Sequence, residues 1–177
     1  MFELYLKDSA VFLDRGKQAS RVANFDDACR HYRASVFCAY SALEAFVYYI
    51  ASSFEQANTV EKHEIAFIND RRVLFDPAVG LKERSEYHSL EDKIRVLLRR
   101  FAPEVNTGMG SWQRLHVFKE FRDSLVHPKQ IEDVTSEAEY LQNATDGLKS
   151  VIDIMNLLSL SIYQRPIRQK LLDLRPD

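Results

Sequence analysis

Four polar residues near the end of a predicted helix have side chains suited to acid–base chemistry. Arg122, Asp123, Ser124 and His127 lie within six positions, directly before Pro128. A proline disfavours α geometry in the residue before it, so the helix should end at or near His127. The carboxyl end of a helix favours a cationic imidazole, which can donate a proton. These residues therefore form the candidate site of the chain.

The spacing restricts how these side chains meet. Asp123 precedes His127 by four residues and shares its helix face, so it can accept a hydrogen bond from the ring. Ser124 is also within reach. Arg122 lies roughly 140° around the helix from His127, so one regular helix would not direct both at one atom. They converge if the last turn unwinds, or if two copies face each other and each supplies half of the site.

The elements that position this site are predicted to be helices. The chain has only 5 Gly and 5 Pro among 177 residues, which favours few, long helices over a β-sandwich or barrel. Apolar spacing and capping signals predict helices over residues 2–23, from Asp26 or Asp27 to Phe54, 60–69, from Ser89 to Phe101, 111–126, and from Ser136 to near Ile162.

The remaining segments are predicted to be irregular. Arg71–Ser89 contains Pro77 and Gly80 and is expected to be a connector, and residues 165–177 form a polar, partly basic tail. The fold class is therefore all-α, an antiparallel bundle of four to five helices, in a single domain of residues 1–177.

Composition sets limits on function. The net charge of −2 and the pI of about 6.2 give no overall attraction to nucleic acid or to an anionic membrane, so a polyanion site would have to be local. The first candidates for RNA phosphate contacts are Arg114, Arg95 and Arg99, although acidic neighbours favour a solvated face. No signal peptide or continuous membrane-spanning stretch is found, so a cytoplasmic protein is expected. Neither a metal-ligand set nor a cofactor motif is recognised, and Cys29 and Cys38 are too far apart on one helix for a disulfide.

The motif and the order of the elements resemble the HEPN superfamily. Arg122-Asp123 with His127-Pro128 ends the penultimate long helix, an early long helix contains residues 42–46 with the sequence ALEAF, and a long apolar helix follows. The resemblance implies a four- or five-helix bundle, usually dimeric, and many such proteins are metal-independent ribonucleases with a composite site from two domains.

The resemblance also implies roles for individual residues. His127 would be the general acid or base that helps the ribose 2′-hydroxyl attack the phosphate, and Arg122 would hold that phosphate. Asp123 would orient His127, and Ser124 could bond a phosphate oxygen. This chain has Asp123 where many members have Asn. Many relatives are toxins paired with a nucleotidyltransferase-like antitoxin or act in phage defence, and others are binding or dimerisation modules.

Structural roles are the alternatives for the same residues. Arg122 could form an ion pair with Asp123 or Glu120, and His127 could cap the helix. Glu44 lies in an apolar run and either pairs with Arg122 or another arginine, or faces water. The favoured hypothesis is a homodimeric, metal-independent endoribonuclease. The alternative is a non-catalytic nucleotide-binding, RNA-binding or protein-interaction dimer.

Overall fold

A computed structural model describes residues 1–57, 60–105, 110–127 and 135–176. Helices make up 73% of the structure and strands 7%, with seven helices in the described part, which agrees with the predicted all-α class. The HEPN-like bundle of four to five helices stays a prediction. The chain forms two compact units, Met1–Leu43 with Asn106–Asp177, and Glu44–Val105. The single-domain organisation stays a prediction.

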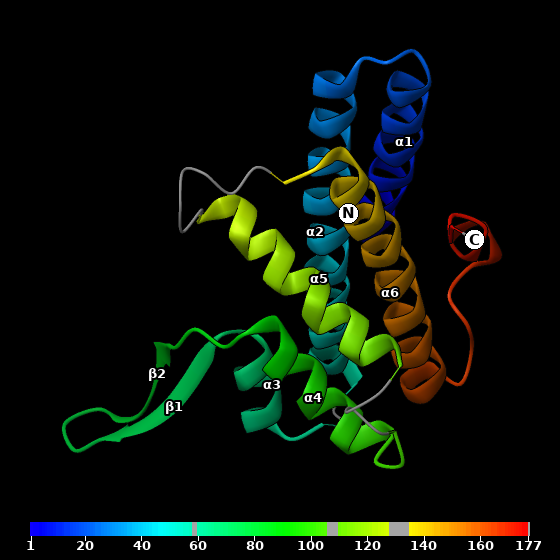
Figure 1. The fold of residues 1–177 in the computed structure, drawn as a ribbon. Helices are drawn as coiled ribbons and strands as arrows, with labels where there is room; N and C mark the ends of the chain where they lie inside the picture. Colours follow the sequence, from blue (N-terminus) through cyan, green and yellow to red (C-terminus); the bar gives the residue numbers. More distant parts are fainter. Residues whose placement is uncertain (58–59, 106–109, 128–134, 177) are drawn as a thin grey trace. The chain divides into compact units, whose positions relative to one another are not determined.

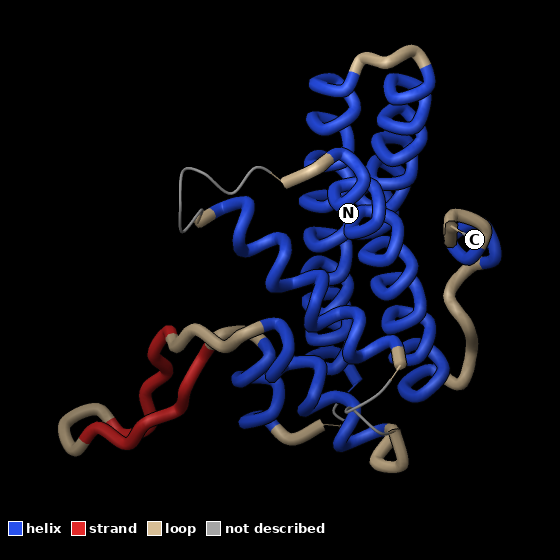
Figure 2. Tube along the Cα trace, in the orientation of Figure 1, coloured by secondary structure: helices blue, strands red, loops and turns tan. Residues whose placement is uncertain are grey.

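The first unit is built from helices alone (Figures 1 and 2). It contains α1 (Phe2–Arg21), the first part of α2 (Phe25–Ala57), α5 (Ser111–Val126), α6 (Glu137–Tyr163) and α7 (Gln169–Leu172). Helices α1 and α6 lie side by side, and α5 packs obliquely along α6. The predicted helices at 2–23, 111–126 and from Ser136 agree with these bounds.

Helices α1 and α2 are held together by small polar groups in a buried contact. The hydroxyl of Ser9 donates to the carbonyl oxygen of Ser35, and that of Ser35 donates to the carbonyl oxygen of Ser9, both at 2.9 Å. The turn between the helices places Ala23 at φ 56°. Asn24 then accepts a bond from the Asp27 N–H at 3.4 Å, so the side-chain cap predicted at Asp26 or Asp27 comes from the preceding asparagine.

Helices α5 and α6 approach each other at a glycine. A Cβ added at Gly147 would lie 2.1 Å from Cε2 of Phe118, so only glycine leaves room for this ring. The ring of Phe118 is fully buried and lies 6.3 Å from that of Tyr40 on α2, measured between centroids. Ser136 caps α6 through the Glu139 N–H, as the sequence predicts.

The C-terminal segment is more ordered than a polar tail. Ile167 and Leu171 are buried, and α7 packs near α1, where Glu3 forms ion pairs with Arg168 at 3.0 Å and Lys170 at 2.9 Å. The prediction for residues 165–177 was therefore incomplete, because two apolar side chains among the charged ones were enough to fix the segment.

The second unit contains an element that the sequence did not predict. Besides the rest of α2 it holds α3 (Lys62–Ile68), β1 (Arg71–Asp76), β2 (Gly80–Ser85) and α4 (Leu90–Phe101). Strands β1 and β2 form an antiparallel hairpin that extends away from α3 and α4 (Figure 2), so the prediction of an irregular connector was wrong. Pro77 begins its turn, Asp76 accepts a bond from the Ala78 N–H, and Gly80 ends the turn at φ 83°.

Helix α2 is long and apolar. Residues Phe25–Gln56 are long and apolar enough to cross a membrane, but 56% of the apolar 18-residue stretch within them is buried inside the protein. Burial of this kind is also typical of the central helix of a globular core. Cys29 and Cys38 on this helix are half-buried and free.

Gly147→Ala should destabilise the protein by about 1 to 3 kcal/mol, because the new methyl group displaces the Phe118 ring. Urea unfolding of the full chain measures the change. Thr145→Ala on the same helix is the control and should change stability by less than about 0.5 kcal/mol. In a Phe118→Leu background, Gly147→Ala should lower the free energy of unfolding by clearly less. An equal decrease in both backgrounds would contradict the contact between Gly147 and Phe118.

Candidate functional site

The candidate site lies at the carboxyl end of α5. The helix stays regular to Val126, and His127 leaves it at φ −127° and ψ 71° while its N–H donates to the Asp123 carbonyl oxygen at 2.9 Å. The predicted helix end at His127 is therefore confirmed, while Pro128 lies outside the described residues. The imidazole of His127 is exposed to solvent.

Arg122 is held in place on the preceding turn. Its Nη1 donates to Oδ1 of Asp123 at 2.7 Å, and its guanidinium carbon lies 4.3 Å from the centre of the Tyr40 ring. A guanidinium over an aromatic face is attracted by the ring electrons. The side chain of Arg122 is 29% exposed, so part of it is accessible to solvent.

Asp123 binds two cations at once. Its second oxygen accepts a bond from Lys119 at 2.8 Å. Burial alone would raise the pKa of Asp123, but the bonds from Lys119 and Arg122 outweigh it, so the pKa lies below its ordinary value and the carboxylate is ionised at neutral pH. Within the described residues the carboxylate makes no bond to the His127 ring, so the orienting role implied by the resemblance is not formed in this conformation.

Ser124 also bonds within its own helix. Its hydroxyl donates to the Phe121 carbonyl oxygen at 2.7 Å, a common use of serine near a helix end. The side chain is exposed, so the oxygen remains an acceptor but its proton is used.

Aromatic and cationic side chains surround this helix end. Arg33 on α2 lies over the ring of Tyr140 on α6 at 5.5 Å, and Phe121 meets the same ring edge-on at 5.7 Å. Tyr40, Arg33 and Tyr140 were not among the residues predicted for this site. No local pattern connects Tyr40 with Arg122 or Arg33 with Tyr140, because each pair comes from different helices.

Arg114, the predicted RNA contact that belongs to the first unit, takes part in an ion-pair network. In the first unit, Arg114 binds Asp153 at 3.3 Å and the Ser111 hydroxyl at 3.0 Å, and Asp153 also binds Arg175 at 2.7 Å. Arg114 is thus part of a network that joins α5, α6 and the C-terminal segment. It also lines a pocket of about 270 Å³ between α5 and α6, together with Gly110, Gln113, Val117, Phe118, Asn143, Asp146 and Gly147.

The remaining three predicted residues belong to the second unit. Arg95 forms an exposed ion pair with Asp92 at 3.6 Å, Arg99 is exposed near the end of α4, and Glu44 is half-buried on α2. The site at the end of α5 is therefore described from residues of the first unit alone.

Comparisons with protein-family models, curated proteins and solved structures find no match to this chain. Membership of the HEPN superfamily consequently stays a prediction from the motif. In the described part of the chain, no three His, Cys, Asp or Glu side chains are grouped so as to hold a metal ion.

A buried lysine in the second unit is the strongest electrostatic feature that sequence reasoning missed. Lys93 on α4 is 3% exposed, and its Nζ lies 2.6 Å from Oδ2 of Asp70 and 3.0 Å from the hydroxyl of Tyr48. The Tyr48 hydroxyl also donates to Asp70 at 2.6 Å, and the N–H of His88 donates to the other carboxylate oxygen at 2.8 Å. Asp70 thus ties α2, α4 and the base of the hairpin together.

The ionised forms of this pair are favoured despite burial. Burial alone would raise the pKa of Asp70, but bonds from Lys93, Tyr48 and the His88 backbone bring it below the ordinary 3.8. Burial would lower the pKa of Lys93, and the same contacts raise it above its ordinary value. A protonated lysine is not a nucleophile, so the cluster is a structural ion pair.

Asp70→Asn should destabilise the protein by about 2 to 3 kcal/mol at neutral pH, because Lys93 keeps its buried charge without a counter-ion. Asparagine tolerates the φ of 55° at this position, so the substitution mainly removes the charge. Since the folded pKa of Asp70 is depressed, its contribution is present above 3.8 and is lost as the pH falls through the folded value. The free energies of unfolding of wild type and variant, measured in urea, should therefore approach each other as the pH falls below about 4.

Glu83→Gln is the matched control, because Glu83 forms an exposed ion pair with Arg71 at 3.2 Å. It should change stability by less than about 1 kcal/mol. A constant difference between wild type and Asp70→Asn across the acidic range would show that the charge of Asp70 is not responsible.

Proposed function

We propose that this chain is an HEPN-like, homodimeric endoribonuclease that works without a metal ion and acts in the cytoplasm. The observation that carries the proposal is the pairing of a positioned guanidinium with an exposed imidazole at one helix end. Arg122 is fixed by Asp123 and Tyr40, and His127 faces solvent where α5 stops. A phosphate bound where two such helix ends meet would contact the cation of one copy and the proton-transfer group of the other.

The regular geometry of α5 supports a site built from two copies. Because the helix does not unwind before Val126, the Cα atoms of Arg122 and His127 keep their separation of roughly 140° around the axis. A second copy that presents the same helix end would place the His127 of one chain near the Arg122 of its partner. An isologous contact of this kind is the usual form of a two-fold dimer.

The reaction that fits these groups is transesterification of RNA. One His127 accepts the proton of the ribose 2′-hydroxyl as its oxygen bonds to phosphorus. The bond from phosphorus to the 5′-oxygen breaks, and the protonated His127 of the second copy gives its proton to that oxygen. Arg122 stabilises the extra charge on the phosphate oxygens, and the product is a 2′,3′-cyclic phosphate.

A second candidate function is supported by the bond between Arg122 and Asp123. This 2.7 Å contact partly neutralises the guanidinium, and an ionised carboxylate close to the site opposes the additional negative charge of the transition state. The same helix end could then serve a non-catalytic dimer that binds nucleotides, RNA or a protein. In either case an antitoxin of nucleotidyltransferase type is the partner we propose to search for by co-purification.

Wild-type protein should cleave a mixed RNA pool in EDTA and leave cyclic-phosphate ends. His127→Ala should cleave the same pool at least about a hundredfold more slowly. His116→Ala is the matched control, since His116 lies on the same helix and pairs with Glu120 at 3.5 Å. It should cleave like wild type. Equal cleavage by all three proteins, or none by wild type, would remove the nuclease proposal in favour of the binding dimer.

Asp123→Asn should raise the rate of cleavage several-fold, because it removes the negative charge beside Arg122 and leaves an amide oxygen to accept the same bond. The readout is kcat/KM on a short RNA. Asp14→Asn, an exposed carboxylate on α1, has the same change of charge and should have little effect. If Asp123→Asn slowed cleavage, the carboxylate would be assisting the reaction instead of opposing phosphate binding.

A further inference from the structure

The β1–β2 hairpin carries different chemistry on its two faces. In the antiparallel register Arg72 is opposite Arg84, Leu74 is opposite Lys82, and Phe75 is opposite Leu81. Directly opposite residues share a face, and alternate residues along a strand share it too. Arg72, Lys82 and Arg84 therefore lie on one side, which we call the basic face. Phe75 and Leu81 lie on the other, which we call the apolar face; the ion pair of Arg71 with Glu83 lies on this side too and carries no net charge.

The basic face has more positive charge than its neighbours neutralise. Arg72 has one exposed ion pair, with Glu86 at 3.6 Å. Lys82 and Arg84 are exposed and make no ion pair with any residue in the described part of the chain. Two arginines directly opposite each other also repel, so this arrangement costs stability in the free protein.

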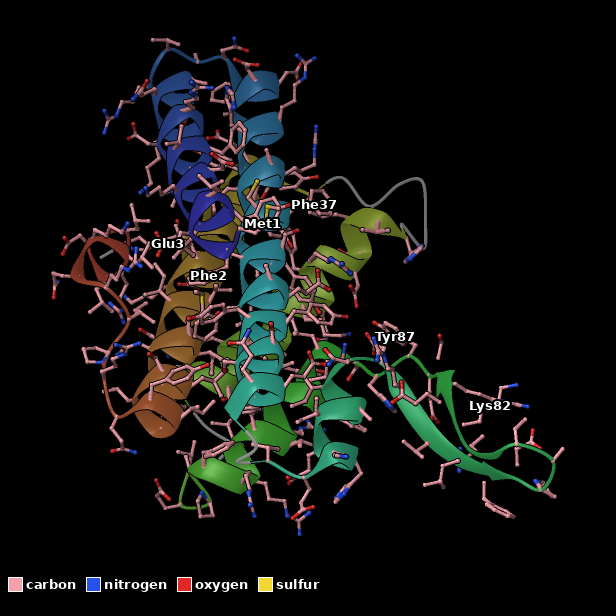
Figure 3. The ribbon with its side chains drawn as sticks, turned by 180° about the vertical axis from the view of Figure 1, so that it is seen from behind. Met1, Phe2, Glu3, Phe37, Lys82 and Tyr87 are labelled. Carbon is pink, nitrogen blue, oxygen red and sulfur yellow. The ribbon has the colours of Figure 1, made fainter. Side chains whose placement is uncertain are left out.

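The apolar face is open to solvent. Phe75 is 74% exposed and Leu81 is 78% exposed, with Val79 in the turn at 70%. Tyr87, just beyond β2, is also exposed; Figure 3 shows it at the base of the hairpin, with Lys82 further out along the strand. A two-stranded ribbon alone is only marginally stable, and these apolar side chains do not stabilise it by burial. Neighbouring apolar side chains that stay exposed in this way indicate a surface for binding.

We propose that the hairpin binds single-stranded nucleic acid that bends around an edge of the ribbon, with its phosphates on the basic face and its bases against the exposed side chains of the apolar face. Charge complementarity selects this occupant, because three cations close together attract a polyanion and aromatic faces stack on any base. Insertion into a lipid membrane is disfavoured by Asp76, whose carboxylate lies in the turn between Phe75 and Val79. The surface shares no residue with the candidate site at the end of α5, and only the identity of the nucleic acid as RNA rests on the proposed function.

The test is binding of a labelled oligouridine with 2′-O-methyl groups, which cannot undergo the cleavage proposed above, measured by fluorescence anisotropy with the full chain. The triple variant Arg72→Gln, Lys82→Gln and Arg84→Gln should weaken binding about tenfold at low salt. It should also lower the slope of log K against log salt by about 2. The matched control is Lys7→Gln, Arg15→Gln and Arg21→Gln, which removes the same charge from exposed positions of α1 and should bind like wild type.

A second variant tests the apolar face. Phe75→Ala with Leu81→Ala should weaken binding roughly fivefold or more and leave the salt slope unchanged, because stacking carries no counterions. Circular dichroism verifies that each variant retains its helices. Oligonucleotide binding that is absent in wild type, or equal in the hairpin triple and the α1 control, overturns the proposal. So does binding of wild type to anionic vesicles but not to the oligonucleotide. Since the probe is not cleaved, a failure of the nuclease proposal leaves this result intact.

Discussion

The contact between Phe118 and Gly147 fixes the position of α5, and the candidate site depends on it. A glycine on α6 allows the ring to lie against the helix backbone, where any side chain would push it away. The same ring lies near Tyr40, and Tyr40 in turn lies beneath Arg122. A series of packed groups thus runs from the interior of α6 to the guanidinium at the helix end. A dense core moves little under thermal motion, so this arrangement holds Arg122 in position before any ligand binds.

At the helix end, Asp123 fixes the position of Arg122 and also reduces its attraction for a phosphate. Asp123 accepts bonds from Lys119 and Arg122, which limits the conformations of both side chains. The same carboxylate competes with any phosphate for the guanidinium. Because His127 on the next turn is exposed, packing does not limit the access of a ligand to its imidazole. The charge of Asp123, more than the shape of the site, therefore determines whether the site catalyses a reaction or only binds a ligand.

The helical elements could be predicted because their apolar residues repeat at three and four over long stretches. Caps such as Ser89 and Ser136 were also recognisable, since each accepts a bond from an N–H three residues later. The hairpin was missed because both faces of its strands meet solvent, so no alternation of buried and exposed residues marks them. Its Pro and Gly were interpreted as irregular structure when they form the turn.

Within the candidate site, the sequence identified the helix end and the bond of Arg122 to Asp123 as one of its alternatives. It could not identify Tyr40 as the platform for Arg122, since 82 positions separate them and no local rule connects the two. The ion pair of Lys93 was hidden for the same reason, as its partners Tyr48 and Asp70 come from other elements. The dimer and the reaction remain predictions.

Asp70 has a consequence for how the second unit fluctuates. Its carboxylate and carbonyl oxygens accept the N–H groups of His88 and Glu86, and Lys93 holds the same carboxylate from α4. The hairpin is therefore fastened at one end, while its turn lacks such bonds to α3 or α4 among the described residues. Opening of the strand pair should begin at the turn and stop near Asp70, so that amide protons exchange in a gradient along the ribbon. Such a hairpin can adapt its tip to an irregular ligand without disturbing the helices that carry it.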